Sequence, residues 1–245
     1  MKAAFTVLEL LVTTMIIAVL ALLSAALLSS VKDSAYNAKC VAGLSQLGLA
    51  TQLYLNDNNN RYFSFVENTT RGRLWYFGLE TGGTNEEGKR DLDASAGPLY
   101  PYIQSIGLIE QCPCFNYHSA DWKPKFNGAS WGYGYNWLLG GGPSGRNRIH
   151  RSAIAHPASV VVFGDCAQVN TFQSPASPDN PMLEEFYIIN ERDRTIHFRH
   201  HNRANFLFAD GHVDSLPLEP GTEDRRIKGE TLGRIAPVGS FKYLR

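Results

Sequence analysis

Residues 5–28 form one long apolar run that is interrupted by a single acidic residue, Glu9. The run contains no other charged residue, and Lys2 lies just before it. A run of this length can cross a lipid bilayer as one helix. A carboxylate inside such a span costs about 2.5–3.5 kcal/mol on insertion scales, so the position of Glu9 predicts a functional role.

Three interpretations of this segment compete. A secretory signal peptide has a shorter apolar region and a small-residue cleavage site, for which residues 24–26 offer only a weak match. A plain N-terminal anchor explains the length of the run but gives no reason for Glu9. A leader that is processed near residue 5 explains Lys2, Ala4, Phe5 and Glu9 together, and we favour it.

The segment from Lys2 to Val12, KAAFTVLELLV, resembles the leader of type IV prepilins and of the pseudopilins of type II secretion. The resemblance implies that a prepilin peptidase cuts between Ala4 and Phe5 and then methylates the new amine of Phe5. The family usually has Gly before the cut, whereas this chain has Ala4. Glu9 would pair with the Phe5 amine of a neighbouring subunit, because a buried carboxylate is tolerated when it is paired.

The apolar pattern continues beyond the first run. Side chains at steps of three and four predict one face of an amphipathic helix, formed by Ala38, Val41, Leu44, Leu47, Thr51 and Tyr54. No proline occurs before Pro98, so nothing in the sequence breaks this helix. We therefore expect a continuous helix from about Phe5 to Leu55, which the Asn- and Asp-rich residues 56–60 end.

These patterns divide the chain into a leader (1–4), a transmembrane or filament-core helix (5–30), its amphipathic continuation (31–57) and an exported globular domain (58–245). The resemblance implies an α+β, pilin-like fold in which the long helix packs on a small antiparallel β-sheet. Within the domain, residues 159–165 predict a buried strand because they are rich in β-branched residues. Residues 130–136 alternate Gly with aromatic residues, which predicts a strand that packs closely against its neighbours.

The charge balance of the chain and its leader-like N-terminal segment together predict where the protein lies in the cell and which partners it has. The chain has 23 basic and 23 acidic residues without a basic stripe, which argues against nucleic acid as a partner. Lys2 ahead of the apolar run places the N-terminus in the cytoplasm. The resemblance then implies a single-pass protein of the bacterial inner membrane with a periplasmic, exported domain. Its partners would be the prepilin peptidase, other filament subunits and an inner-membrane assembly platform.

The four cysteines are Cys40, Cys112, Cys114 and Cys166. The exported side of the membrane permits disulfides in many bacteria. A Cys112–Cys114 bridge would close a very small ring, so we expect Cys40 to pair with Cys112 or Cys114. Four buried free thiols are the alternative, and a zinc site is less favoured because Cys-x-Cys lacks a matching second pair.

Residues 195–216 carry a second signature. The segments 195–200, 204–209 and 212–216 predict strands, and Asp210-Gly211 is a strong signal for a two-residue hairpin turn. The sequence therefore predicts a three-stranded antiparallel meander. His200, nine intervening residues and then Asp210-Gly211 resemble the processing-associated His-x9-Asp-Gly region of prepilin-type proteins.

Two roles are open for the polar residues of this region. We favour a structural role, in which His200 and Asp210 bond to turn backbone and set the strand register. Alternatively, a membrane-tethered exported enzyme or metal-binding module would use a cluster made of His197, His200, His201, His212, Asp165, Asp210 and Asp214. No cofactor is expected; calcium stays open because it prefers oxygen ligands, with Asp165 and Asp210 as candidates. No nucleophile motif occurs, which favours a structural subunit over an enzyme.

Overall fold

The computed structural model describes residues 6–81, 88, 90–106, 112–127, 132–142 and 145–243; the side chains of residues 24–30, 105–106 and 241 are not described. The expected cleavage site between Ala4 and Phe5 lies outside these residues. Within them, no helix is long and apolar enough to cross a membrane. The described helices therefore do not support the membrane span predicted over residues 5–30.

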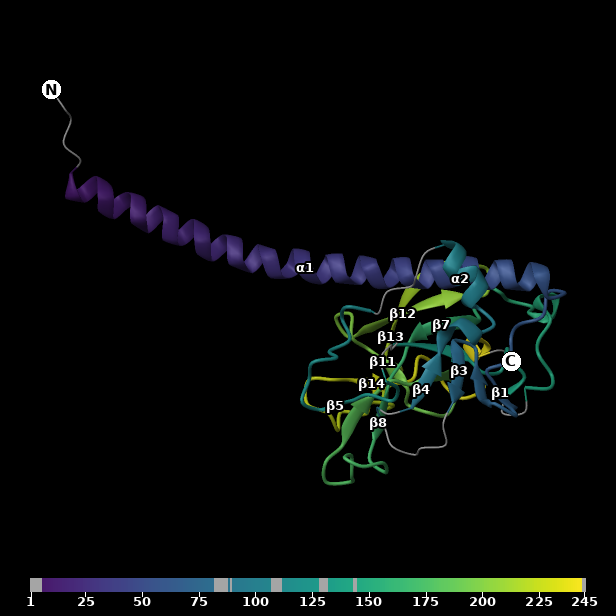
Figure 1. The fold of residues 1–245 in the computed structure, drawn as a ribbon. Coiled ribbons are helices and arrows are strands. Elements are labelled where there is room, and N and C mark those ends of the chain that lie inside the picture. The colour runs from purple at the N-terminus through teal and green to yellow at the C-terminus, as the bar shows by residue number, and fades with distance from the viewer. Residues whose placement is uncertain are drawn as a thin grey trace.

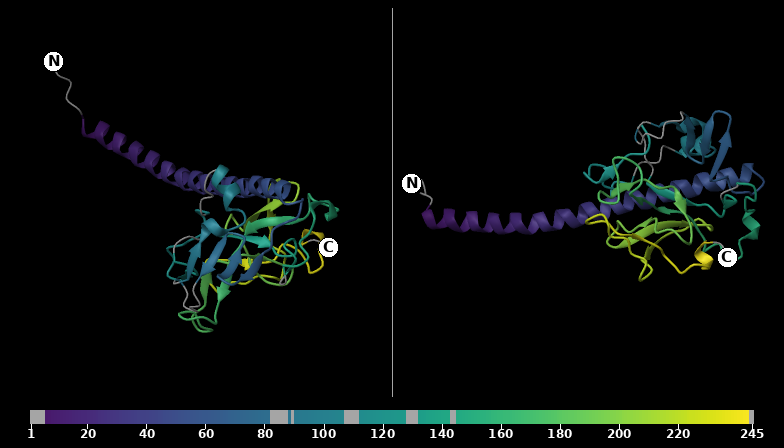
Figure 2. Two further views of the ribbon diagram at one scale, coloured as in Figure 1. Left: turned by 45° about the vertical axis from the view of Figure 1, so that its right-hand side comes forward. Right: turned by 90° about the horizontal axis from the view of Figure 1, so that it is seen from below.

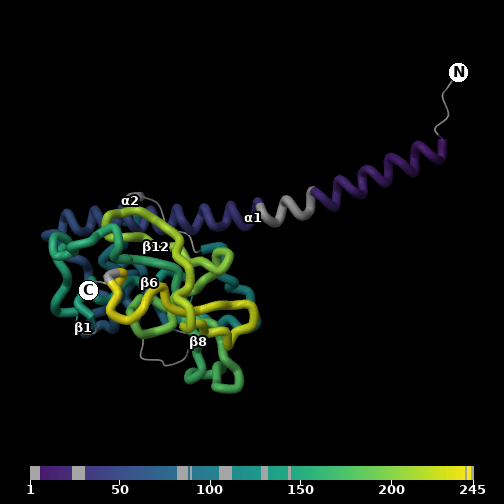
Figure 3. Tube along the Cα trace, turned by 180° about the vertical axis from the view of Figure 1, so that it is seen from behind, coloured from purple at the N-terminus to yellow at the C-terminus, as the bar shows by residue number. Residues whose placement is uncertain are grey.

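The first described element is helix α1 (Val7–Asp57). The sequence predicts this helix from about Phe5 to Leu55. Thr6 caps its N-terminus and Asn58 its C-terminus. Asn59 and Asn60 follow with positive φ angles of 53° and 55°, a conformation that asparagine tolerates better than most residues. The C-terminal half of α1 lies along the globular domain, and the N-terminal half extends away from it (Figure 1, Figure 3).

The domain packs against one face of the C-terminal half of α1. Leu44, Leu47 and Tyr54 are buried there, as is Thr51, whereas Ala38 is exposed and does not belong to this face. They join a core that is rich in aromatic rings, including Tyr62, Phe63, Tyr76, Tyr135 and Phe163. Burial of each large side chain stabilises the fold by roughly 1.5–3 kcal/mol, so this contact anchors α1 to the domain.

Four sheets make up most of the domain. The first has the order β1 (Val66–Thr69), β2 (Gly72–Trp75), β3 (Gly78–Thr81), β4 (Asp91–Asp93). The central sheet has the order β10 (Ile188–Ile189), β6 (Tyr133–Asn136), β7 (Val161–Asp165), β12 (Arg203–Phe208), β13 (Val213–Pro217). The third is β5 (Trp122–Lys123), β9 (Met182–Glu184), β8 (Gln168–Asn170), and the fourth pairs β11 (Ile196–His197) with β14 (Leu232–Gly233).

Short helical segments connect these sheets. They are α2 (Tyr100–Ile106) and the 3-10 turns η1 (Ala94–Ala96), η3 (Arg151–Ala153) and η4 (Phe241–Tyr243). Helix α2 lies beside α1, and strand β12 runs beneath α1, so the helix packs on one face of the central sheet (Figure 1, Figure 2).

The predicted α+β, pilin-like fold class is wrong. It placed the helix on one small antiparallel sheet, whereas beyond α1 the described residues form fourteen strands in four sheets. Two strand pairs, β10–β6 and β5–β9, are parallel. Many of these strands have only two to four residues, which is too short for an apolar alternation to be recognised in the sequence. The globular part is therefore mainly β, with mixed sheets.

The predicted meander over residues 195–216 is also wrong in part. β12 and β13 form the expected hairpin around Asp210-Gly211. β11, however, pairs with β14, and the second neighbour of β12 is the buried strand β7. The left-handed residues His201 and Asn202 turn the chain between β11 and β12, with φ angles of 51° and 61°. β7 therefore occupies the place in the central sheet that the prediction assigned to residues 195–200.

Candidate functional site

Glu9 lies in the first turn of α1. Its Oε2 accepts hydrogen bonds from the Thr6 amide at 2.9 Å and the Thr6 hydroxyl at 2.8 Å, and the Glu9 amide donates to the Thr6 hydroxyl at 3.3 Å. This reciprocal capping box satisfies amides at the start of the helix. Within the described residues Oε1 accepts no hydrogen bond, so it is free to contact a cation from outside the chain.

The N-terminal half of α1 is apolar on all sides. Twelve of its large apolar side chains are between 48% and 79% exposed in the single chain: Val7, Leu8, Leu10, Leu11, Val12, Met15, Ile16, Ile17, Val19, Leu20, Leu22 and Leu23. We call residues 7–23 the apolar arm. Monomeric soluble proteins rarely expose a continuous apolar surface of this extent, so the arm marks an interaction surface.

The second conspicuous feature is a buried ionic network around Asp165, the last residue of β7. Its Oδ1 accepts a hydrogen bond from Arg199 Nη2 at 2.6 Å. Its Oδ2 lies 3.1 Å from His200 Nε2 and accepts the Asn205 amide at 2.7 Å. Arg199 also donates to the Gly132 carbonyl at 2.6 Å. The network ties β7 to the turn that precedes β12 and to the backbone just before β6.

The protonation of this network follows from its partners. Burial favours the neutral form of Asp165, but Arg199, His200 and the Asn205 amide together lower its pKa below the ordinary value. Burial opposes the charge on Arg199 as well, yet the adjacent carboxylate raises the pKa of the guanidinium. Both carboxylate oxygens are engaged within the chain, so Asp165 holds the fold in place here.

His197 extends the network towards the fourth sheet. Its Nε2 lies 2.7 Å from Glu230 Oε2, and its Nδ1 lies 3.3 Å from Arg199 Nη1. Burial, together with the neighbouring Arg199 charge, lowers the pKa of His197, although Glu230 acts in the opposite direction. The Phe115 ring covers both groups, with Arg199 4.9 Å from its centroid.

The sequence-predicted site residues are only partly brought together. The expected bond of the His200 side chain to turn backbone is wrong, because this side chain turns into the core towards Asp165. Asp210 lies at the other end of β12, where its Oδ1 accepts the His212 amide at 3.1 Å and lies 2.6 Å from His212 Nδ1. Asp210 therefore stabilises the hairpin turn, while His200 belongs to the buried network.

The cysteines occupy two places. Cys40 of α1 forms a disulfide with Cys112, which is one of the two expected pairings. Cys114 and Cys166 are free. Burial raises the pKa of both thiols, that of Cys166 to about 12. His200 adjoins the disulfide, with Nε2 3.8 Å from Cys112 Sγ, so the ionic network and the sulfur atoms meet at this ring.

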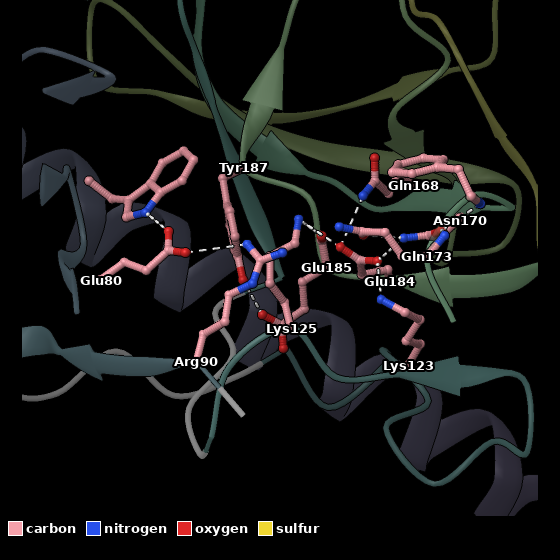
Figure 4. A network of polar contacts seen from close by, with 12 residues as sticks. Glu80, Arg90, Lys123, Lys125, Gln168, Asn170, Gln173, Glu184, Glu185 and Tyr187 are labelled. Carbon is pink, nitrogen blue, oxygen red and sulfur yellow. Dashed lines mark hydrogen bonds and ion pairs between the residues drawn. The ribbon is translucent and has the colours of Figure 1, made fainter. Parts of the chain in front are cut away.

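A further buried network escapes sequence analysis (Figure 4). Glu184 is completely buried and lies 2.9 Å from Lys123 Nζ and 2.7 Å from Lys125 Nζ. Gln168 donates to it at 3.0 Å, and Asn170 also donates to it. Burial opposes the charge on Glu184, but Lys125 and Lys123 lower its pKa below the ordinary value. These residues lie on or just after short strands, up to 61 positions apart, and no local motif links them.

No protein-family model, curated protein or solved structure matches this chain.

Proposed function

We propose that this protein is a structural filament subunit related to pseudopilins. A prepilin peptidase would cut it between Ala4 and Phe5 and methylate Phe5, and an inner-membrane assembly platform would add it to a filament of the type II secretion or type IV pilus kind. The apolar arm would lie in the bilayer before assembly and in the centre of the filament afterwards. The domain beyond α1 would face outwards.

The main support for the proposal is the exposure of the apolar arm. It is apolar all round and projects from the domain, so the globular part of its own chain leaves it uncovered (Figure 2). A helix that is hydrophobic all round requires an apolar environment on every side. Arms from other copies supply that environment, and each large side chain that they bury contributes roughly 1.5–3 kcal/mol.

Glu9 supports the proposal because it gives such a bundle a defined register. Its Oε2 is engaged by Thr6, and its Oε1 remains for a cation from another copy. The methylated amine of Phe5 in a neighbouring subunit would be that cation. A carboxylate in an apolar bundle is tolerated only where it is paired with a cation. A neighbouring subunit shifted along the filament axis would leave Glu9 without that cation.

The test combines processing with assembly in native membranes. Intact-mass and N-terminal analysis should give a chain that begins at Phe5 and carries one methyl group, and electron microscopy should show filaments. Glu9→Gln keeps the shape of the side chain and removes its charge; it should leave the domain folded but abolish filaments. Glu67→Gln, at an exposed carboxylate of β1, is the matched control and should assemble normally.

Two results would argue against the proposal. A mature chain that still begins at Met1 would exclude processing. Normal filaments from the Glu9→Gln variant would show that Glu9 does not set the register.

A further inference from the structure

Four residues that commonly bind zinc converge beside the buried ionic network. Cys40 comes from α1, Cys112 and Cys114 come from the segment before β5, and His200 precedes β12. Their ligand atoms all lie within 4.8 Å of one another. Tetrahedral Zn²⁺ with Zn–S bonds of about 2.3 Å places its sulfur ligands about 3.8 Å apart. After reduction, the Cys40 and Cys112 sulfur atoms would move apart to this spacing, and the more distant ligand pairs would move slightly closer. We propose that reduction of the Cys40–Cys112 disulfide converts this cluster into a Cys3His zinc site.

His200 faces the sulfur cluster through one ring nitrogen. Its Nε2 lies 3.8 Å from Cys112 Sγ and also 3.1 Å from Asp165 Oδ2. To bind zinc, Nε2 would exchange its contact with Asp165 for the metal ion, while Asp165 keeps its hydrogen bonds from Arg199 and the Asn205 amide. The ring is buried, and its Nδ1 has no hydrogen-bond partner among the described residues, so that nitrogen leaves Nε2 available as the ligand without breaking a second bond.

A pocket gives access to the cluster. Its volume is about 260 Å³, and its lining includes Cys114 and His200 together with Asp33, Tyr36, Asn37 and Arg199. Cys114 is only partly buried, so a metal ion could reach the sulfur atoms from this side. Zn²⁺ with three thiolates and a neutral imidazole carries one net negative charge. The adjacent Arg199 guanidinium favours that charge, while Asp33 across the pocket opposes it.

The conversion takes place in two steps, reduction and metal binding. A dithiol reductant supplies two electrons and two protons, which break the S–S bond and leave the Cys40 and Cys112 thiols, while the reductant becomes a disulfide. Binding of Zn²⁺ then releases three protons to solvent from Cys40, Cys112 and Cys114 as three Zn–S bonds form. His200 contributes one Zn–N bond from a ring-nitrogen lone pair. The disulfide and the zinc site exclude each other, because both use the sulfur atoms of Cys40 and Cys112.

The experiment uses the full chain in detergent. The protein is reduced with a phosphine, and Co²⁺ is added as a spectroscopic probe before Zn²⁺ displaces it. The reduced chain should bind one equivalent of Co²⁺ with the strong visible absorption of a tetrahedral thiolate site, and Zn²⁺ should bleach it. The oxidised chain should not show this absorption. Far-UV circular dichroism, recorded with and without metal, follows the fold in parallel.

Two cysteine variants separate this site from adventitious thiol binding. Cys114→Ser should weaken Zn²⁺ binding by more than the roughly 10–100-fold typical of losing an outer partner, because it removes a direct ligand. Cys166→Ser removes the other free thiol, which lies outside the cluster, and should bind like the wild type.

If the reduced chain unfolds and Zn²⁺ restores its fold, the proposal is supported, because metal binding then drives folding. If the reduced chain binds no Co²⁺, whether it is folded or not, the proposal is overturned. Equal binding by Cys114→Ser and the wild type would overturn it as well.

Discussion

Nη2 of Arg199 lies 2.6 Å from Oδ1 of Asp165, with side-chain exposures of 2% and 0%. Removing one partner of such a pair leaves the other charge buried and uncompensated. Asp165→Asn should therefore lower the free energy of unfolding by about 3–5 kcal/mol, measured by urea denaturation. Asp210→Asn, in the partly exposed hairpin turn, should change it by about 0–1 kcal/mol. Equal stabilities of the two variants would show that the buried pair does not hold the central sheet.

Stability should fall with decreasing pH in two stages. Burial lowers the pKa of His197, so protonation favours the unfolded chain as soon as the pH drops below the ordinary histidine value of 6.5. The pKa values of Asp165 and Glu184 are lowered by their cationic partners despite burial, so their contributions are lost below their ordinary values of 3.8 and 4.5. The melting temperature, measured from about pH 8 down to about pH 3, should show both declines in stability. A melting temperature that stays constant from neutral pH to about pH 5 would contradict the assignment of His197 as a neutral buried group.

The Cys40–Cys112 disulfide should contribute substantially to stability. It links residues 72 positions apart and fastens α1 to the domain. The chain-entropy model gives about 4 kcal/mol for a loop of this length. Cys40→Ser together with Cys112→Ser should lower the urea midpoint accordingly, whereas Cys114→Ser should leave it nearly unchanged under oxidising conditions. A double variant with the wild-type midpoint would show that α1 docks without the covalent link.

Glu184 should be the critical member of its network. Glu184→Gln removes the negative charge that Glu184 supplies to Lys123 and Lys125, and we expect a loss of about 3–5 kcal/mol in chemical denaturation. Lys125→Met should cost less, because Lys125 is 12% exposed and Lys123 still pairs with the carboxylate. If the lysine variant proves the more damaging of the two, the contacts of the Lys125 ammonium with the Phe186 and Tyr187 rings matter more than its ion pair with Glu184.

Gly134 should not tolerate a side chain. A Cβ atom there would lie 2.7 Å from Cβ and Sγ of Cys166, which is too close without a shift of β6 or β7. Gly134→Ala should therefore lower the unfolding free energy by about 1–3 kcal/mol, measured by urea denaturation. Gly211→Ala meets open space, and its φ of 98° alone should cost about 1–2 kcal/mol. A Gly134→Ala variant of wild-type stability would show that β6 can move away from β7.

Local patterns predict those parts of the fold that depend on neighbouring residues. The buried strand β7 follows from a β-branched run, and the β12–β13 turn follows from Asp210-Gly211. The close packing of β6 follows from its glycine, since Gly134 faces Cys166. Strands of two or three residues, such as β10 and β14, have no such signal, and their partners lie far away in sequence. Sequence patterns therefore could not predict the arrangement of the sheets or the fold class.

The sequence by itself determined the apolar arm with its single carboxylate and the residues at which the chain turns, because these depend on side chains a few positions apart. Only the tertiary structure decided that His200 meets Asp165 rather than Asp210, that Cys40 bonds to Cys112, and that Glu184 lies between two lysines. Each of these contacts joins residues that are 35 to 72 positions apart. Buried charges and thiols are recognised by what surrounds them in space, and a linear pattern does not contain that information.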